Sequence, residues 1–362
     1  MHIPDSIGGH RISSIGDYAF ARSSRLTSVE IPLGISKIGA NPFAGCDSLD
    51  EITVSPDHEY LATIDGVLFS KADKRLVSYC PKVGAAAYSV PRGIKCIGQD
   101  AFDSCENLKI IELPDTISEI GDDAFHGCEN LRTISLPDGL SAFGQNPFSG
   151  CHSLEEIMVS AEHPILSVVD GVLFDNVGNR LVVAFDLKKE AVEHYVVPDG
   201  IEVIDESAFA KLEMLKSISI PESVREIRDQ AFCSCRGLTE VILPIGVREI
   251  GKQAFSGCQC LKLVALQEGL TMIGDMAFEG CVSLRGIELP EGMAYVGAKA
   301  FCDDANLAAI SIPASVIEIG EDAFMGCEIL KATVARDSYA RQYCIYHDIA
   351  FDYFDSLDWL LE

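Results

Sequence analysis

Hydrophobic and polar positions along the chain repeat with a period of 23 residues. In residues 113–135, LPDTISEIGDDAFHGCENLRTIS, polar residues and glycine separate the apolar Ile120, Phe125 and Leu131. Eight of the ten gaps between successive repeat phenylalanines are 23 residues long, and the other two are 59 and 61. These spacings predict eleven repeat units with two insertions. The repeat phenylalanines are Phe20, Phe43, Phe102, Phe125, Phe148, Phe209, Phe232, Phe255, Phe278, Phe301 and Phe324.

Each unit contains a short extended stretch. Ile134, Ser135 and Leu136 alternate apolar and polar side chains, as a strand does. Pro137 ends this stretch because proline cannot donate to a continuing sheet. One unit cannot bury its own apolar face, whereas stacked units pair their backbones and bury it jointly. The pattern therefore predicts a mainly β solenoid of 23-residue coils with short helical turns, in which equivalent Phe, Leu and Ile side chains form internal columns.

A glycine stands four residues before the repeat phenylalanine in most units, where we expect a corner that needs permissive backbone angles. Two units carry Asp205 and Arg228 at this place instead. The glycines are Gly16, Gly39, Gly98, Gly121, Gly144, Gly251, Gly274, Gly297 and Gly320.

Eight of the 14 cysteines lie three residues after a repeat phenylalanine. A place set by stacking favours a small, buried, polarisable side chain, so we interpret these cysteines as structural thiols. Neighbouring coils bring such thiols within reach of disulfide formation, but parallel side chains give poor bridge torsion angles, and a reducing environment is the simpler interpretation. The eight are Cys46, Cys105, Cys128, Cys151, Cys235, Cys258, Cys281 and Cys327.

One unit has the residue types of a reactive site. His126 lies two residues before Cys128, and a Cys beside a His can form a thiolate nucleophile or half of a metal site. However, Cys128 is one of the repeated thiols and His126 occupies a variable outward place, so we interpret the pair as coincidental. The nearby Asp122 and Asp123 are interpreted as a solvated face.

Other candidate chemistry is weak. Four thiols in neighbouring units have the chemistry of zinc ligands. Two of them belong to the inward column, and the other two lie one and five residues after their phenylalanines, so the four are not expected to converge. The chain contains no HExxH, GxSxG, P-loop or Rossmann glycine motif. We therefore predict that the protein is not an enzyme and binds neither a cofactor nor a metal. The four thiols are Cys233, Cys235, Cys258 and Cys260.

The two insertions, at about 55–90 and 160–197, resemble each other. DGVLF occurs at 65–69 and again at 170–174, and a second apolar strand follows at Arg75 and at Arg180. The intervening SKADK and DNVGN are turn-like, so each pair of strands predicts a β-hairpin. His58 and His163 also hold equivalent places. Two interpretations stay open: a variant coil packed on the solenoid, or a protruding edge that binds a partner.

Residues 1–336 are thus predicted to form the solenoid, and residues 337–362 a C-terminal cap with an acidic tail. Residues 338–347 suit a short helix with Asp337 or Ser338 as its N-cap. The tail, 355–362, holds the single Trp, and it either folds onto the last coil or binds a partner. At the other end, the loop GGHR takes up residues that exceed the repeat length.

The charge balance limits the classes of partner that the protein can bind. There are 55 acidic and 28 basic residues, for a net charge of −27. Nucleic-acid binding needs a basic stripe, and none is present in the sequence. No apolar run reaches the roughly 18 residues of a membrane helix, and no signal peptide is visible at the start. We expect a protein partner, with neither nucleic-acid binding nor membrane insertion.

The unit IPxSVxxIGxxAFxGCxxLxxI resembles the BspA-like leucine-rich repeat family. It appears here as IPASVIEIGEDAFMGCEILKAT and IPESVREIRDQAFCSCRGLTEV, and the resemblance covers nearly the whole chain. It implies a right-handed leucine-rich repeat solenoid with strands on the concave face. It also implies a protein-binding module, located at a bacterial cell surface or secreted, that acts as an adhesin for host proteins. The absent signal and the free-thiol interpretation favour an alternative, an intracellular scaffold for protein–protein interaction.

The strand face is the default interaction surface of such repeat folds. Ile242, Leu263 and Ala265 are outward in the predicted strands and make a small apolar patch, flanked by Glu240 and Glu288. We predict these five residues as a protein-binding site on the concave face. A modest exposed apolar cluster without a partner is the alternative.

Overall fold

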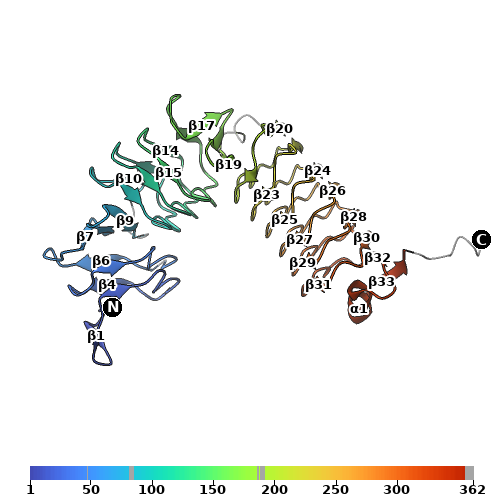
Figure 1. The fold of residues 1–362 in the computed structure, drawn as a ribbon, viewed down its shortest axis with the longest axis horizontal. Helices are drawn as coiled ribbons and strands as arrows, with labels where there is room; N and C mark the ends of the chain where they lie inside the picture. Colours follow the sequence, from blue (N-terminus) through green and yellow to red (C-terminus); the bar gives the residue numbers. More distant parts are fainter. Residues whose placement is uncertain (47, 81–84, 186, 188–191, 355–362) are drawn as a thin grey trace, which may run out of the picture. The chain divides into compact units, whose positions relative to one another are not determined.

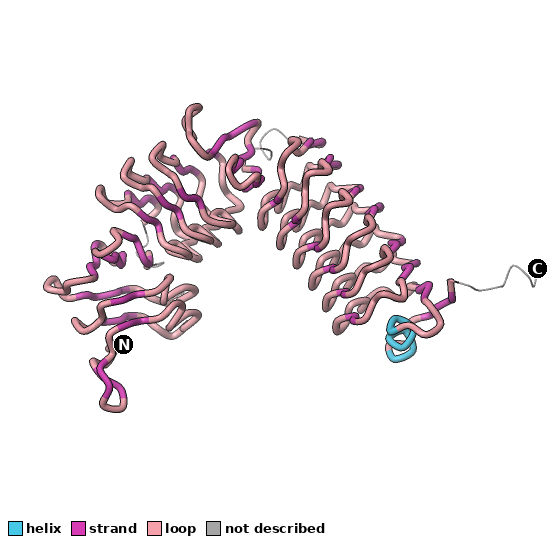
Figure 2. Tube along the Cα trace, viewed as in Figure 1, coloured by secondary structure: helices cyan, strands magenta, loops and turns pink. Residues whose placement is uncertain are grey.

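The computed structural model describes residues 1–46, 48–80, 85–185, 187 and 192–354 (Figure 1). The chain divides into two compact units, Met1–Val177 and Gly178–Glu362. In both units, a typical coil gives a strand of three or four residues to one side, the long-strand face, and a strand of two residues to the other, the short-strand face (Figure 2). The mainly β solenoid with 23-residue coils is therefore confirmed.

In the first unit, parallel strands pair with a shift of one repeat, as Ile110 does with Thr133 and Thr133 with Glu156. The long-strand face contains β4 (Ser28–Ile31) and β6 (Glu51–Val54), then β10 (Ala87–Ser89), β12 (Ile110–Glu112), β14 (Thr133–Ser135) and β16 (Glu156–Met158). The short-strand face contains β3 (Ser14–Ile15) and β5 (Lys37–Ile38), then β9 (Arg75–Ser78), β11 (Cys96–Ile97), β13 (Glu119–Ile120) and β15 (Ala142–Phe143).

The second unit repeats this plan. Its long-strand face contains β20 (His194–Val196), β22 (Ser217–Ser219), β24 (Glu240–Ile242) and β26 (Leu263–Ala265), followed by β28 (Gly286–Glu288), β30 (Ala309–Ile312), β32 (Lys331–Val334) and β33 (Ala350–Tyr353). Its short-strand face contains β19 (Arg180–Ala184), β21 (Val203–Ile204), β23 (Glu226–Ile227), β25 (Glu249–Ile250), β27 (Met272–Ile273), β29 (Tyr295–Val296) and β31 (Glu318–Ile319).

The repeat phenylalanines form the expected internal columns. In the second unit, ring centroids from Phe209 to Phe324 follow one another at 5.1–5.6 Å, with nearly parallel rings. This spacing is close to the distance of about 4.8 Å between paired strands, so hydrogen bonding between coils sets the stacking of the rings. Each buried ring removes a large apolar area from water, which makes the column a main source of stability.

The repeated cysteines form a second column, as predicted. All eight are buried, and all 14 cysteines are free thiols. In seven of the eight, Sγ donates to the carbonyl of the phenylalanine 26 residues earlier, at 3.0–3.2 Å. Burial raises the pKa of Cys258 and Cys281 well above the ordinary value, which keeps them as neutral thiols.

The corner glycines are required by close packing between coils. A Cβ atom at Gly121 would lie 2.7 Å from the backbone nitrogen of Gln99, and one at Gly297 would lie 2.4 Å from that of Asp275. Neither glycine has a positive φ, so the cause is space and not the permissive backbone angles that the sequence suggested.

The first insertion contains one strand more than the predicted hairpin. The expected pair is present as β8 (Val67–Ser70) antiparallel to β9, with a register shift at Leu68/Phe69. In addition, β7 (Leu61–Ile64) pairs antiparallel with β8 through a two-residue turn. Both turn residues, Asp65 and Gly66, have positive φ, which is typical of a type I′ hairpin. The second insertion repeats this with β17 (Leu166–Val169) and β18 (Val172–Asp175).

The predicted C-terminal helix is present, and the N-terminal loop proves to be part of a hairpin. At the C-terminal end, α1 (Tyr339–Tyr346) has Ser338 as N-cap, and the Ser338 hydroxyl accepts from the amide of Arg341. Tyr343 packs edge-on against Phe324, so the helix covers the end of the phenylalanine column. At the N-terminal end, β1 (Ser6–Ile7) and β2 (His10–Arg11) form a hairpin around the extra glycines. The tail at 355–362 lies outside the described residues.

Candidate functional site

The five predicted binding residues lie on neighbouring strands of one face. β24 and β26 are parallel, and their register pairs Glu240 with Leu263 and Ile242 with Ala265. Ile242 and Leu263 therefore lie diagonally across adjacent strands, with exposed fractions of 57% and 51%. Glu288, on the following strand β28, is also exposed. Strand pairing thus brings together apolar side chains that are 21 residues apart in sequence.

Val196 is a further exposed apolar residue of this face, and the sequence reasoning missed it. It is 69% exposed on β20 and holds the same strand place as Ile242, but Ser219 of β22 lies between the two. Val196 lies at the end of the second insertion, where the 23-residue period is interrupted and cannot assign a face. The strand pattern HYVVP was the available signal. We call Ile242, Leu263 and Ala265 the apolar patch of the long-strand face.

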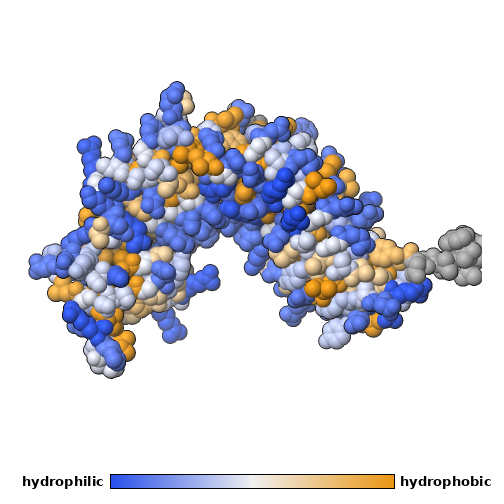
Figure 3. Space-filling model, in the orientation of Figure 1, coloured by the Kyte–Doolittle hydropathy of each residue, from blue (hydrophilic) through white to orange (hydrophobic). Residues whose placement is uncertain are grey.

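The first unit exposes apolar residues at the same strand places without joining them. Ile110 and Met158 are 43% and 47% exposed, but they lie on β12 and β16, with Thr133 and Ser135 of β14 between them. Figure 3 shows a surface on which apolar areas are scattered among hydrophilic ones. Isolated exposed apolar residues of this kind are normal and need no functional explanation.

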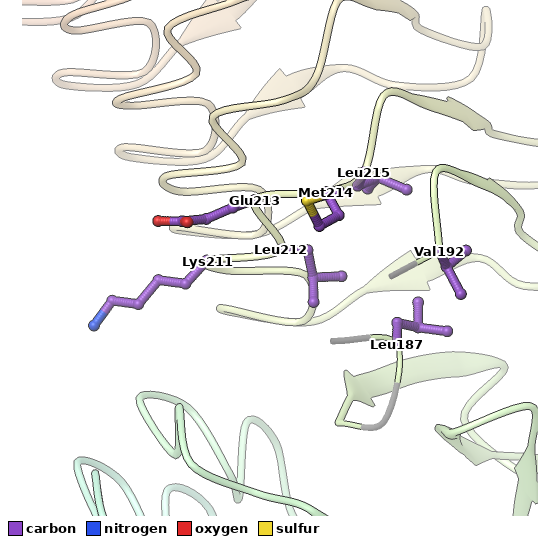
Figure 4. A pocket seen from close by; sticks show the side chains of 7 residues that line it. All are labelled: Leu187, Val192, Lys211, Leu212, Glu213, Met214 and Leu215. Carbon is purple, nitrogen blue, oxygen red and sulfur yellow. The ribbon is translucent and has the colours of Figure 1, made fainter. Parts of the chain in front are cut away.

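A small apolar cavity lies at the first coils of the second unit (Figure 4). Leu187, Val192 and Leu212 form its apolar wall, and its volume is about 270 Å³. The side chains of Lys211 and Glu213 extend away from that wall. The volume is just below the roughly 300–1,000 Å³ of ordinary ligand sites. Among the lining residues that the structure describes, no group suited to acid–base or nucleophilic catalysis faces the apolar wall.

His126 and Cys128 do not form a site together. The Cys128 thiol is buried and donates to the Phe102 carbonyl, whereas His126 Nδ1 lies 2.9 Å from a carboxylate oxygen of Asp103 in the preceding coil. His126 lines an open hollow of about 360 Å³ with Asp100, whose carboxylate accepts from the Tyr18 hydroxyl at 2.6 Å. Burial raises the pKa of Asp100, and the Tyr18 hydrogen bond opposes that rise.

Asp122 is exposed, as interpreted from the sequence, but its carboxylate also has a partner in the protein. Its Oδ1 accepts a hydrogen bond from the amide of Gln145, one coil further, at 2.7 Å. Asp17, Asp229 and Asp275 hold the same repeat place and make the same bond to the next coil, at 2.7–2.8 Å. These carboxylates therefore satisfy backbone donors at the turn, which is a structural role.

The four candidate zinc ligands are held apart by their roles. Cys235 and Cys258 are in the buried thiol column, Cys233 is half-buried beside Ser234, and Cys260 is exposed. Among the residues that the structure describes, no three His, Cys, Asp or Glu side chains are arranged to hold a metal ion. Within the same described ranges, no helix has the length and apolar character needed to cross a membrane.

Comparison with known proteins gives a family and a fold. The family model described as BspA type leucine rich repeat region matches residues 5–83, 78–176, 183–304 and 226–349, with 6 copies. A leucine rich cell surface protein of Faecalibacterium prausnitzii A2-165 is 24% identical, over 97% of this chain and 90% of that chain, with a TM-score of 0.53. The pneumococcal vaccine antigen PcpA is 19% identical, over 97% of this chain and 87% of that chain, with a TM-score of 0.53.

At these identities the two solved structures support the fold alone. No curated protein matches the chain.

Proposed function

Because the chain belongs to the BspA-type leucine-rich repeat family, we propose that it is a non-enzymatic module that binds a protein partner through the long-strand face of its second unit. The observation that carries the proposal is that Ile242 and Leu263 are both exposed and lie next to each other on paired strands. Half-exposed aliphatic side chains on a rigid sheet favour protein contact, since they can be desolvated without ordering a loop.

The charged residues around the apolar patch restrict the kind of protein that can bind to it. Glu240 and Glu288 flank it, and the whole chain carries a net charge of −27. Such a surface favours a partner that places apolar side chains at its centre and basic ones at its rim. We propose Glu240, Ile242, Leu263, Ala265 and Glu288 as the binding residues.

We further propose that the module acts at a bacterial cell surface as an adhesin for host proteins. Support comes from the family and from the structural neighbour described as a cell surface protein. An intracellular scaffold is the second candidate, and it is favoured by 14 thiols without a disulfide. Fractionation of the producing cells, with detection of the protein in each fraction, distinguishes the two locations.

The test of the binding face is a capture experiment with a matched control. Ile242→Asp with Leu263→Asp places two carboxylates in the centre of the apolar patch, and we expect capture to fall at least tenfold, because burying unpaired charge opposes binding. Ile110→Asp with Met158→Asp changes the same strand places in the first unit, where the residues are not joined, and should leave capture unchanged.

Capture is measured by quantitative mass spectrometry against two extracts, host extracellular protein and cytosol of the producing cell. Retention of the same captured proteins by the patch variant at unreduced yield would exclude this face.

A further inference from the structure

Asp304 replaces a thiol in the cysteine column of the second unit. It stands three residues after Phe301, at the place that Cys281 and Cys327 occupy in the coils before and after it. Its side chain is fully buried, and neither carboxylate oxygen has a hydrogen-bond partner. A buried ionised carboxylate without a partner is very unfavourable, so the group must be neutral or the local packing must open.

The thiol column shows what the missing hydrogen bond is. Cys281 donates to the Phe255 carbonyl at 3.2 Å and Cys327 donates to the Phe301 carbonyl at 3.1 Å. The same step of 26 residues from Asp304 leads to Phe278. An ionised carboxylate can only accept, whereas a protonated one carries a single O–H donor and can take the place of the thiol.

The side chains that act on Asp304 are neutral thiols or acidic groups, whereas the Cys281 backbone favours the ionised form. Thiols of Cys281 and Cys327 lie above and below it in the column, and both have pKa values raised by burial. The charged groups that act on it, Asp303 and Glu279, are acidic. Burial raises the pKa of Asp304 to about 8, with the Cys281 backbone opposing and the two carboxylates adding to the rise.

The nearby cation Lys299 does not offset this repulsion. It acts on Cys302 in the same turn, where its charge lowers a pKa that burial raises.

We propose that the protonation state of Asp304 controls whether the coils around it are closed or open. They are closed when the protonated carboxyl donates to the Phe278 carbonyl, and they open when that proton is lost. The direction follows from linkage. A carboxyl whose pKa is higher in the closed state than in the open state stabilises the closed state most at acid pH, and that stability falls as pH rises from about 4 to about 8. The closed state of these coils is therefore more stable at acid pH than at neutral pH.

Amide hydrogen exchange of the full chain between pH 5 and pH 8 tests the proposal. After correction for the intrinsic exchange rate, peptides covering residues 278–330 should open about tenfold more for each pH unit from 5 to 7, and level off near 8. Asp304→Asn keeps the shape without the titrating proton, and Asp304→Cys restores the thiol of the column. Both variants should show no such slope.

The column supplies an internal control as well. Peptides covering residues 232–258 carry thiols at the same place in two successive coils and should show no pH slope in any of the three proteins. Equal slopes in the natural chain and in either variant would overturn the proposal, and Asp304→Cys serves this purpose even if Asp304→Asn does not fold.

Discussion

The two insertions carry an arginine at equivalent places, and the two arginines lie in different surroundings. In the first unit, Arg75 donates to the Ile38 carbonyl at 3.0 Å and pairs with the exposed Asp73, also at 3.0 Å. In the second unit, the Arg180 side chain is only 7% exposed and pairs at 3.1 Å with Asp205. Asp205 is fully buried and pairs with a second arginine, Arg228, at 2.8 Å.

The corner glycines explain the difference. The coils after Arg75 turn at glycine, whereas those after Arg180 turn at Asp205 and Arg228. The two exceptions to the glycine pattern are therefore partners of each other, and Arg180 joins them. Burying Asp205 and Arg180, with Arg228 half-buried beside them, costs desolvation that their attraction offsets only with good geometry. We infer that the triad specifies how these coils pack, without giving the second unit more stability than glycine corners give the first.

Removing the shared carboxylate is the largest expected disturbance. Asp205→Ala leaves the buried Arg180 and the half-buried Arg228 without this partner. It should cost about 3–5 kcal/mol of unfolding free energy, mainly through Arg180. Arg75→Ala should cost about 1 kcal/mol, because Asp73 stays solvated and only hydrogen bonds are lost. Denaturant unfolding followed by circular dichroism measures both, and amide exchange places each loss in its unit.

A triple variant tests whether the triad is replaceable. Arg180→Leu, Asp205→Gly and Arg228→Gly together remove every member and restore the glycine corners. This variant should recover most of the stability that Asp205→Ala loses. The comparison fails if the triple variant is as unstable as Asp205→Ala, or if Arg75→Ala is equally damaging.

The corner glycines themselves give the next effect. Gly121→Ala places a Cβ atom 2.7 Å from the backbone of Gln99 and should cost about 1–3 kcal/mol, since the backbone of the preceding coil must move. Gly16→Ala is the matched control: the glycine holds the same repeat place, but no atom lies within 4 Å of its added Cβ. The control should unfold at the denaturant midpoint of the natural chain. A similar loss in both would show that backbone conformation, and not space, selects glycine.

Much of the fold follows from the sequence because every stacked coil repeats the same local structure. The phenylalanine and thiol columns and the strand register are each set by the 23-residue period, so one unit predicts its neighbours. The five candidate binding residues were placed on one face for the same reason. What the period cannot predict is a contact between two residues that both depart from it, as Asp205 and Arg228 do.

Three further features were missed for separate reasons. Strand β7 was missed although Asp65-Gly66 is a strong hairpin signal, because the turn after β8 was taken as the only one. Val196 was missed because it follows an insertion. The hydrogen bond of Asp122 was missed because a surface carboxylate looks the same in sequence whether it meets water or the next coil.

The smallest expected effect is the response of the first insertion to acid. In the first, His58 Nδ1 accepts from the amides of Tyr60 and Leu61 at 3.2 and 3.1 Å, so the ring proton lies on Nε2, which donates to the Pro32 carbonyl. In the second, His163 makes the equivalent bonds to Ile165, Leu166 and Pro137. A second proton on the His58 ring would face amide donors, so acid should open the first insertion.

Lys71 adds to the acid sensitivity of the first insertion. Burial lowers the pKa of His58, the Pro32 hydrogen bond opposes this, and the charge of Lys71 lowers the pKa further. Because the folded pKa is below the unfolded one, this stability is present above about pH 6.5 and is lost as pH falls through it. The equivalent of Lys71 in the second insertion is the neutral Asn176. Lys71→Asn should therefore raise the pKa of His58, measured by NMR titration of its ring protons. An unchanged His58 titration would mean that burial and the Pro32 hydrogen bond set its pKa without a contribution from Lys71.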